Sequence, residues 1–192
     1  TASLTALAQD GTRLYTMDSA GTLRVVDIDG FTFGLRGSLI LNEVPGKLFV
    51  GDAIVYAPTA PPGQASVGGY ATIDVSDPDA PYLIADVQSQ TGVVSPGVDF
   101  ATSGSGVGIV IGRSQETPVL DIHDTSDPTV TNNFLTRFLL PSTANDVAIA
   151  SGIAYVANSS AGLLVANYLS FDSHRRVPTL SVSVADHDPG TP

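Results

Sequence analysis

The segment Ala71-Thr72-Ile73-Asp74-Val75 has the pattern of a short β-strand that ends in an aspartate. Related phrases occur at Leu23–Ile28, Pro118–Ile122 and Leu163–Asn167. With Asp27, Asp74, Asp121 and Asn167 as anchors, successive copies are 47, 47 and 46 residues apart. Self-similarity at such an interval is the sequence signature of a repeat architecture, in which each repeat is one supersecondary unit.

The residues before each anchor complete a unit of several strands. A first apolar segment runs into a tight turn, and the turn pairs are Asp10-Gly11, Gly51-Asp52, Ser103-Gly104 and Ser151-Gly152. Glycine and aspartate suit short hairpins because these turns need residues with positive φ. A second strand, the anchor strand and a fourth strand follow, as at Tyr82–Val87 and in the alternating stretch Leu180–Val184.

Four strands in ~45 residues predict an all-β chain built as a β-propeller of four blades. We assign the propeller to residues 1–176, with blades at approximately 3–41, 42–90, 91–142 and 143–184, and an exit linker at 185–192 leading to a possible following module. A β-sandwich is the alternative fold. The blades form either a closed four-blade ring or half of an eight-bladed ring completed by a second copy, because an open arc exposes an apolar face that drives association.

Composition narrows the classes of function. The chain has 8 Lys and Arg against 19 Asp and Glu, a formal net charge of −11, which argues against nucleic acid and anionic lipid as partners. Hydrophobic residues make up 43% of the chain and charged residues 14%, so we expect a packed core. No apolar run approaches the ~20 residues of a membrane-spanning helix, so no membrane insertion is expected.

Three stretches resemble the LVIVD-type propeller repeat: Ile73–Pro78 followed by Ala80-Pro81, Leu120–Pro128, and Ile153–Asn158 followed by Ala161-Gly162-Leu163. The resemblance covers nearly all of residues 3–170. It weakens in the first unit, which has Asp27–Gly30 in place of Ser-Asp-Pro, and in the fourth, which has Asn167 and no Asp-Pro. It implies a secreted or surface-associated bacterial or archaeal protein, in which immunoglobulin-like or cadherin-like modules often follow the propeller.

Two acidic clusters are candidate metal sites. They consist of Asp74, Asp77 and Asp79, and of Asp121, Asp124 and Asp127. Carboxylates gathered in a loop can bind Ca²⁺, which takes 6–8 oxygen ligands. Turn chemistry explains the same residues, because Asp-Pro fixes a turn and the carboxylate accepts backbone N–H groups. The spacing is not that of an EF-hand, so turns are the favoured interpretation; Asp186-His187-Asp188 is a weaker candidate in the predicted linker. No other cofactor is expected.

The histidines His123, His174 and His187 fall in predicted loops and lack the spacing of a zinc site. We expect them at the surface, with the pKa of His123 raised by Asp121 and Asp124 beside it.

Asp99, Asn145 and Asp146 are the candidate functional residues at the mouth of the channel. They lie near the first strands of the third and fourth units, and the first strands of a propeller line its channel. The alternative is that they bind inner-strand backbone or channel water. No nucleophile motif occurs, and Gly104–Gly108 is predicted to be a flexible hairpin. The long connection Pro58–Gly69 is either a contact surface or a spacer.

The sequence therefore predicts a non-enzymatic propeller module of an extracellular or cell-surface protein, acting as a scaffold or interaction platform. The surface location follows from the family resemblance alone. Alternatives are a calcium-stabilised adhesion module and a hydrolase or lyase with its site in the channel. The expected partner is a protein or a glycan, with a homodimer as one way to complete the ring.

Overall fold

A computed structural model describes residues 2–41, 46–59, 68–87 and 95–172 of the chain, with no side-chain description for 95–98. Almost all of its regular structure is β, and the described helical turns are the short 3₁₀ segments Ser159–Ala161 and Leu169–Phe171. Within the described ranges, no helix is long and apolar enough to span a membrane.

The strands form four antiparallel sheets, each of which follows chain order. Blade 1 contains β1 (Leu4–Asp10), β2 (Arg13–Asp18), β3 (Thr22–Asp29) and β4 (Thr32–Ile40). Blade 2 contains β5 (Phe49–Gly51), β6 (Ile54–Thr59), β7 (Gly69–Asp74) and β8 (Tyr82–Ala85). Blade 3 contains β9 (Ser95–Thr102), β10 (Val107–Ser114), β11 (Thr117–Asp124) and β12 (Phe134–Leu139). Blade 4 contains β13 (Asp146–Ala150), β14 (Ile153–Ala157) and β15 (Leu163–Asn167).

Several predicted segments lie outside the described residues. They include the predicted fourth strand of blade 4 at 180–184 and most of the connection 58–69. His174 and the linker 185–192, which contains Asp186, His187 and Asp188, also lie outside them.

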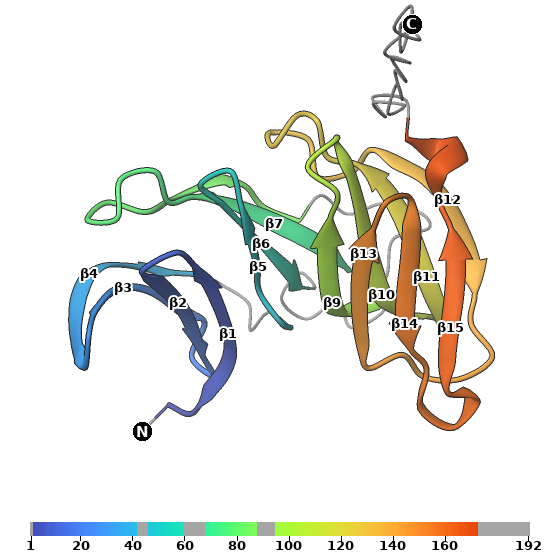
Figure 1. The fold of residues 1–192 in the computed structure, drawn as a ribbon, viewed down its shortest axis with the longest axis horizontal. Coiled ribbons are helices and arrows are strands. Elements are labelled where there is room, and N and C mark those ends of the chain that lie inside the picture. The colour runs from blue at the N-terminus through green and yellow to red at the C-terminus, as the bar shows by residue number, and fades with distance from the viewer. Residues whose placement is uncertain (1, 42–45, 60–67, 88–94, 173–192) are drawn as a thin grey trace, which may run out of the picture.

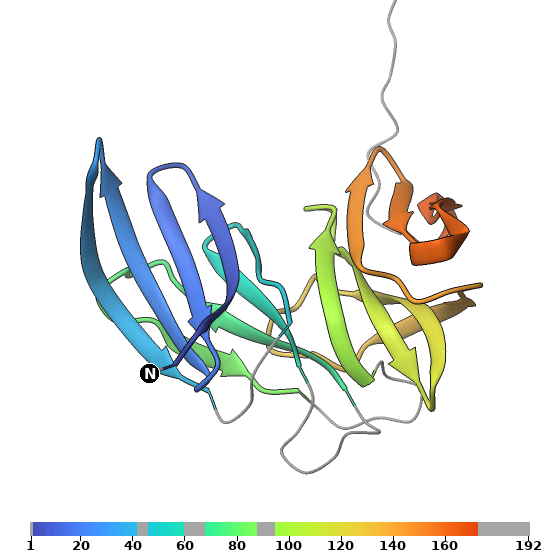
Figure 2. The same ribbon diagram turned by 90° about the horizontal axis from the view of Figure 1, so that it is seen from below.

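The four sheets follow one another along an arc, with blade 1 at one end and blade 4 at the other (Figures 1 and 2). The first strands are in contact from blade to blade, β1 with β5, β5 with β9, and β9 with β13. They therefore line the inner side of the arc. This is the four-blade β-propeller arrangement that the repeats predict, and not two sheets packed as a sandwich.

Each blade has two faces, which we name by chain direction. The forward face looks toward the following blade and the backward face toward the preceding one. Strand alternation divides the apolar residues between them, because successive side chains in a strand point to opposite faces. In blade 1, for example, Tyr15 and Met17 lie on the forward face and pack with Val55 and Ala57 of the backward face of blade 2.

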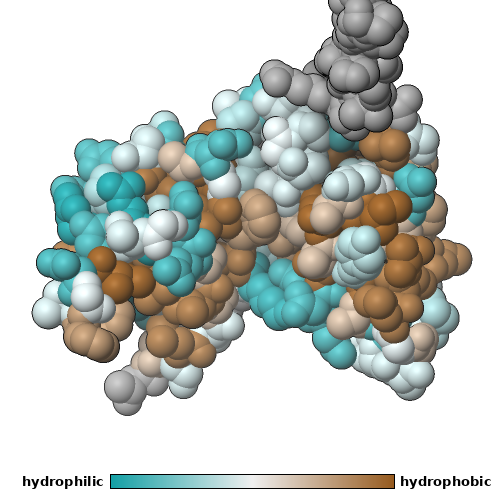
Figure 3. All heavy atoms as spheres, in the orientation of Figure 1, coloured by the Kyte–Doolittle hydropathy of each residue, from teal (hydrophilic) through white to brown (hydrophobic). Residues whose placement is uncertain are grey.

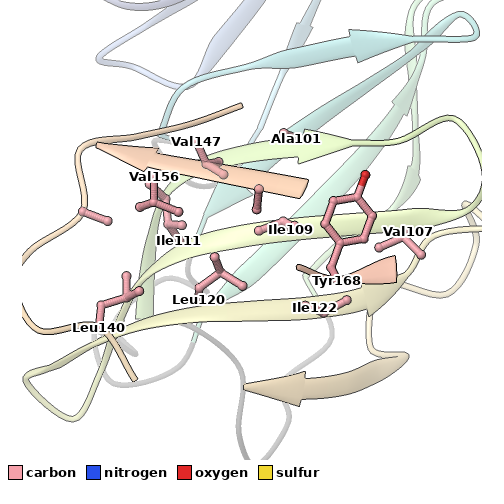
Figure 4. Packing of buried hydrophobic residues seen from close by; sticks show 12 residues of the cluster. Ala101, Val107, Ile109, Ile111, Leu120, Ile122, Leu140, Val147, Val156 and Tyr168 are labelled. Atoms are coloured by element: carbon pink, nitrogen blue, oxygen red, sulfur yellow. The ribbon is translucent and has the colours of Figure 1, made fainter. Parts of the chain in front are cut away.

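Three clusters of buried side chains join the blades. Between blades 1 and 2 the cluster includes Met17, Leu23, Val25, Val55, Ile73 and Val75. Between blades 2 and 3 it consists of Tyr56, Tyr70, Phe100, Val110 and Val119. Between blades 3 and 4 it includes Ile109, Ile111, Leu120, Ile122, Ala154 and Val156 (Figure 4). Full burial of a large apolar side chain contributes about 1.5–3 kcal/mol, so these interfaces hold the arc together.

One backbone hydrogen bond closes the central hairpin of every blade and fixes how the repeats align. The residue after the anchor donates its N–H to the residue before β2, β6, β10 or β14, in the pairs Ile28–Thr12, Val75–Ala53, Thr125–Gly106 and Tyr168–Gly152. Asp124 is therefore the equivalent of Asp74, and the assignment of Asp121 as an anchor is wrong by three residues. The shared pattern Asp-x-Ser-Asp-Pro at 74–78 and 124–128 carries this alignment in the sequence.

Candidate functional site

Asp99, Asn145 and Asp146 lie together on the inner side of the arc, and Lys47 joins them. Lys47 Nζ lies 3.0 Å from Asp146 Oδ2 and 3.6 Å from Asp99 Oδ2. It also donates a hydrogen bond of 2.9 Å to the backbone oxygen of Asn145. Lys47 comes just before β5, so this inner-strand cluster connects three blades. Figure 3 shows a hydrophilic patch at the centre of the molecule, where the lower ends of β9 and β13 lie in Figure 1.

Backbone contacts hold Asp99 in place. Its Oδ1 accepts the N–H of Phe100 at 2.9 Å, and its Oδ2 accepts the N–H of Val147 at 3.0 Å. Asp99 is buried, so it ties β9 to β13 without facing solvent. Asn145 is fixed in a similar way, because its Nδ2 donates to Ser159 Oγ at 3.0 Å and its N–H to Ala157 O at 2.9 Å.

The two carboxyl groups of the cluster have different pKa values because their surroundings differ. Burial, followed by the hydrogen bond with Asp146, raises the pKa of Asp99 to about 6. The same hydrogen bond, helped by Lys47, lowers the pKa of the exposed Asp146. The pair can hold one proton near pH 6. The hydrogen bond from Val147 and the ion pair with Lys47 connect Asp99 to the two neighbouring blades, while the hydrogen bond from Phe100 holds its side chain in place within β9.

Lys47 is the member that sequence reasoning missed. A signal was present, since Lys47 is the chain's only lysine and precedes the first strand of its blade, as Asn145 does in blade 4. Strand position therefore could have placed both at the same end of the inner strands.

The acidic cluster of blade 2 lies in turns. Asp74 Oδ1 accepts the N–H and hydroxyl of Ser76 at 2.8 and 2.5 Å, and these bonds lower the pKa of Asp74. Asp77 Oδ1 accepts the N–H of Asp79 at 3.0 Å. Asp79 instead binds Arg36 of blade 1 through two hydrogen bonds of 2.8 and 2.7 Å.

The acidic cluster of blade 3 is divided between a turn and the interior. Asp124 Oδ1 accepts the N–H of Ser126 at 2.9 Å, and Asp127 Oδ1 accepts that of Thr129 at 2.9 Å. Asp121 is buried in β11, three residues earlier. Across the described ranges, no three His, Cys, Asp or Glu side chains converge in a way that could hold a metal ion.

His123 lies inside the molecule, so the prediction of a surface histidine in a loop is wrong. It belongs to β11, is fully buried, and neither ring nitrogen has a hydrogen-bond partner. Burial lowers its pKa to about 4, and the positive charge of Arg137 adds to this effect. The expected rise from Asp121 and Asp124 does not occur, since burial disfavours the charged form of the ring.

Asp121 is held by Arg137, which lies directly opposite it on β12. Arg137 Nε and one terminal nitrogen each donate to a different Asp121 oxygen at 2.6 Å. Burial raises the pKa of Asp121 to about 7 in spite of this contact. The pair lies on the backward face of β11 and β12, at the interface between blades 2 and 3.

A cleft of about 410 Å³ lies between blades 2 and 3, at the end of β5 opposite Lys47. Its lining includes Phe49, Asp52, Thr102, Thr125 and Ser126, with Gly104 and Gly106 of the predicted hairpin. The buried hydroxyl of Thr125 has no hydrogen-bond partner. Hydroxyl groups, a carboxylate and an aromatic ring are the groups that bind small polar ligands in preformed clefts.

Comparison with solved structures identifies the same fold. The chain is similar to the computationally designed Ika4 protein, with 12% identity over 86% of this chain and 91% of that one, and a TM-score of 0.59. The designed Ika8 protein shows 13% identity over 85% and 45% of the two chains, with a TM-score of 0.57. BamB from Moraxella catarrhalis shows 12% identity over 87% and 47%, with a TM-score of 0.57.

The chain thus spans most of Ika4 and under half of Ika8 and BamB. At this level of identity the likeness establishes the β-propeller fold alone. No protein-family model matches the sequence. No curated protein matches it either.

Proposed function

We propose that the chain is a non-enzymatic interaction module of an extracellular or cell-surface protein, which acts by packing sheet faces against a partner. The observation that carries this proposal is the pair of apolar faces at the two ends of the arc. Propeller neighbours such as BamB and the designed proteins fit a scaffold of this kind. The proposed location rests on the resemblance to the LVIVD-type repeat.

The backward face of blade 1 is one of these end faces. Strand register places Leu7, Leu35 and Phe33 on the side of the sheet away from blade 2. Leu4 and Ile40 lie on the same side, and the five side chains are between 59% and 74% exposed. The ion pair of Asp18 with Arg24 lies among them on this face. Isolated exposed leucines are ordinary, whereas several large apolar side chains exposed on one sheet face mark an interaction surface.

The forward face of blade 4 is the other end face. Tyr155 and Val165 are paired across β14 and β15, and Leu163 lies beside them on the same face. Their exposed fractions are 41%, 57% and 68%. Figure 3 shows hydrophobic residues gathered over β13–β15. Removing apolar surface from water is favourable by about 25 cal/mol for each Å² that a partner covers.

A fluorescent dye such as ANS tests whether these faces are available, because it binds exposed apolar surface. At a chain concentration low enough that light scattering shows single chains, Leu163→Glu on blade 4 and Leu35→Glu on blade 1 should each reduce dye binding by the folded chain. Leu139→Glu is the matched control, since Leu139 is 71% exposed but lies at the edge of blade 3. Equal dye binding by the wild-type chain and all three variants would contradict the proposed function.

A further inference from the structure

We propose that the partner of the two end faces is a second copy of this chain. The forward face of blade 4 in one copy packs on the backward face of blade 1 in the other, and the reverse contact closes a two-fold ring of eight blades. This inference rests on the interaction function proposed above and assigns its partner.

Equivalent residues in the other blades show that the end face of blade 4 is an interface position. Tyr155 lies at the third position after the hairpin-closing residue, where the other blades have Tyr15, Tyr56 and Ile109. Those three side chains are between 0% and 6% exposed. Tyr155 alone is 41% exposed.

Val165, which pairs with Tyr155, is likewise exposed where its counterparts in the other blades are buried. Val165 pairs with Tyr155 across the hairpin, as Val25, Thr72 and Ile122 pair with their counterparts. The three counterparts are fully buried, whereas Val165 is 57% exposed. In every other blade this patch is covered by the backward face of the next blade.

Blade 1 presents the complementary half of the contact. Its backward face carries Leu14 paired with Val26, at the positions that Val55 and Ile73 occupy in blade 2. Val55 and Ile73 are fully buried under blade 1, whereas Leu14 and Val26 are half-buried. The pairing rule of the three internal interfaces, forward face on backward face, therefore continues from blade 4 to a blade 1.

A second copy supplies that blade because the arc keeps the two end blades of one chain apart (Figures 1 and 2). One contact between copies would leave two end faces free and would extend into a fibre. Two reciprocal contacts cover all four end faces, so the assembly stops at two copies. Each copy carries a net charge of −11, so association should strengthen as salt screens the repulsion.

Light scattering on the 192-residue chain tests the proposal. We expect twice the 19.7 kDa chain mass at chain concentrations above the dimer dissociation constant. Leu163→Glu and Leu35→Glu should each weaken dimerisation by about tenfold or more, since each change places a charge in both contacts. Leu139→Glu should dimerise like the wild-type chain. Circular dichroism and the melting temperature confirm that each variant is folded.

Mixing the two variants tests the head-to-tail pairing. A mixed dimer of Leu163→Glu and Leu35→Glu chains has one contact with both faces intact. At a concentration at which each variant alone is mostly monomeric, the equimolar mixture should therefore form more dimers than either variant. If blade 4 bound blade 4, the Leu35→Glu variant would dimerise normally, and this result would overturn the arrangement.

The remaining outcomes separate the two proposals. A wild-type chain that stays at 19.7 kDa but binds dye in a way that Leu163→Glu and Leu35→Glu reduce would overturn the two-copy ring and leave the interaction function standing. A mass that grows without limit with concentration would overturn ring closure. A monomer whose dye binding does not depend on either face would overturn both.

Discussion

The two faces of blade 3 share one set of strands yet bury different chemistry. The forward face contributes Ile109, Ile111, Leu120 and Ile122 to an aliphatic contact with blade 4. The backward face contributes Phe100, Val110 and Val119, together with the polar Asp121 and His123, to the contact with blade 2. An aliphatic interface needs only matching shapes, whereas buried polar groups need specific partners to offset the loss of water.

On the backward face of blade 3, some buried polar groups have partners and others do not. Asp121 has a two-point contact with Arg137, and Phe100 stacks on Tyr56 with ring centres 4.8 Å apart. His123 packs edge-on against Tyr70 but leaves both ring nitrogens without partners. We therefore expect substitutions on this face to have effects of both signs, while substitutions on the aliphatic face only destabilise.

The largest effect is expected from Arg137→Ala. This change leaves the Asp121 carboxyl buried without its partner and should lower the free energy of unfolding by about 3–5 kcal/mol. Urea denaturation at pH 7 measures it. The double variant Asp121→Leu with Arg137→Met is the control, because it removes both charges and should unfold close to the wild-type chain. If Arg137→Ala behaved like the double variant, the ion pair would have no role in the interface.

A smaller loss is expected from Gly108→Ala. A Cβ atom at this position would lie 2.6 Å from both Phe100 Cζ and Thr125 Cγ2. Two side chains of the interface must then shift, which should cost about 1–3 kcal/mol in the free energy of unfolding. Gly34→Ala is the matched control in β4, since nothing lies within 4 Å of its Cβ. A loss of the same size in Gly34→Ala would assign the effect to strand backbone and not to packing.

The smallest effect at neutral pH is expected from His123→Leu, and its sign is opposite. The change removes two unpaired ring nitrogens and should raise the free energy of unfolding by about 1–2 kcal/mol at pH 7. The wild-type chain should lose further stability as pH falls from 6.5 toward 4. In that window the unfolded histidine takes up a proton, while burial keeps the pKa of the folded His123 at about 4.

The difference in free energy of unfolding between His123→Leu and the wild-type chain should therefore increase as the pH falls. Unfolding curves at several pH values between 4 and 7 measure it, and groups common to both chains cancel in the difference. Ile122→Val, next in sequence but on the forward face, should cost about 1 kcal/mol at every pH. A constant gap for His123→Leu would show that His123 takes up a proton as readily in the folded chain as in the unfolded chain.

Sequence reasoning worked where the controlling interactions are local. Asp74 and Asn167 end their strands as predicted, since each side chain accepts the N–H of the residue two positions later. Asp99, Asn145 and Asp146 lie close together because each is near a first strand, and first strands line the inner side of a propeller. The anchor Asp121 was misplaced because blade 3 has longer central strands than blade 2, so a fixed interval no longer follows the hairpin.

Contacts between residues that are far apart in the chain could not be predicted from the sequence. Lys47 bridges to residues of β9 and β13 that lie in the next two blades. With Asp121 taken as the end of the strand, His123 is predicted to lie in a loop. Its burial depends on a contact with Tyr70 of blade 2. The position of Lys47 before a first strand indicates the end of the inner strands at which it lies, but the sequence around His123 does not indicate that Tyr70 covers it.

The sequence by itself determined the strands, the turns and the four-blade repeat, because alternation and turn chemistry act over a few residues. Only the tertiary structure decided which apolar faces are covered. Tyr15 and Tyr155 occupy the same position in similar strands, yet the first is buried and the second exposed. The physical reason is that burial depends on the sheet that lies opposite, and blade 4 has no following blade among the described residues.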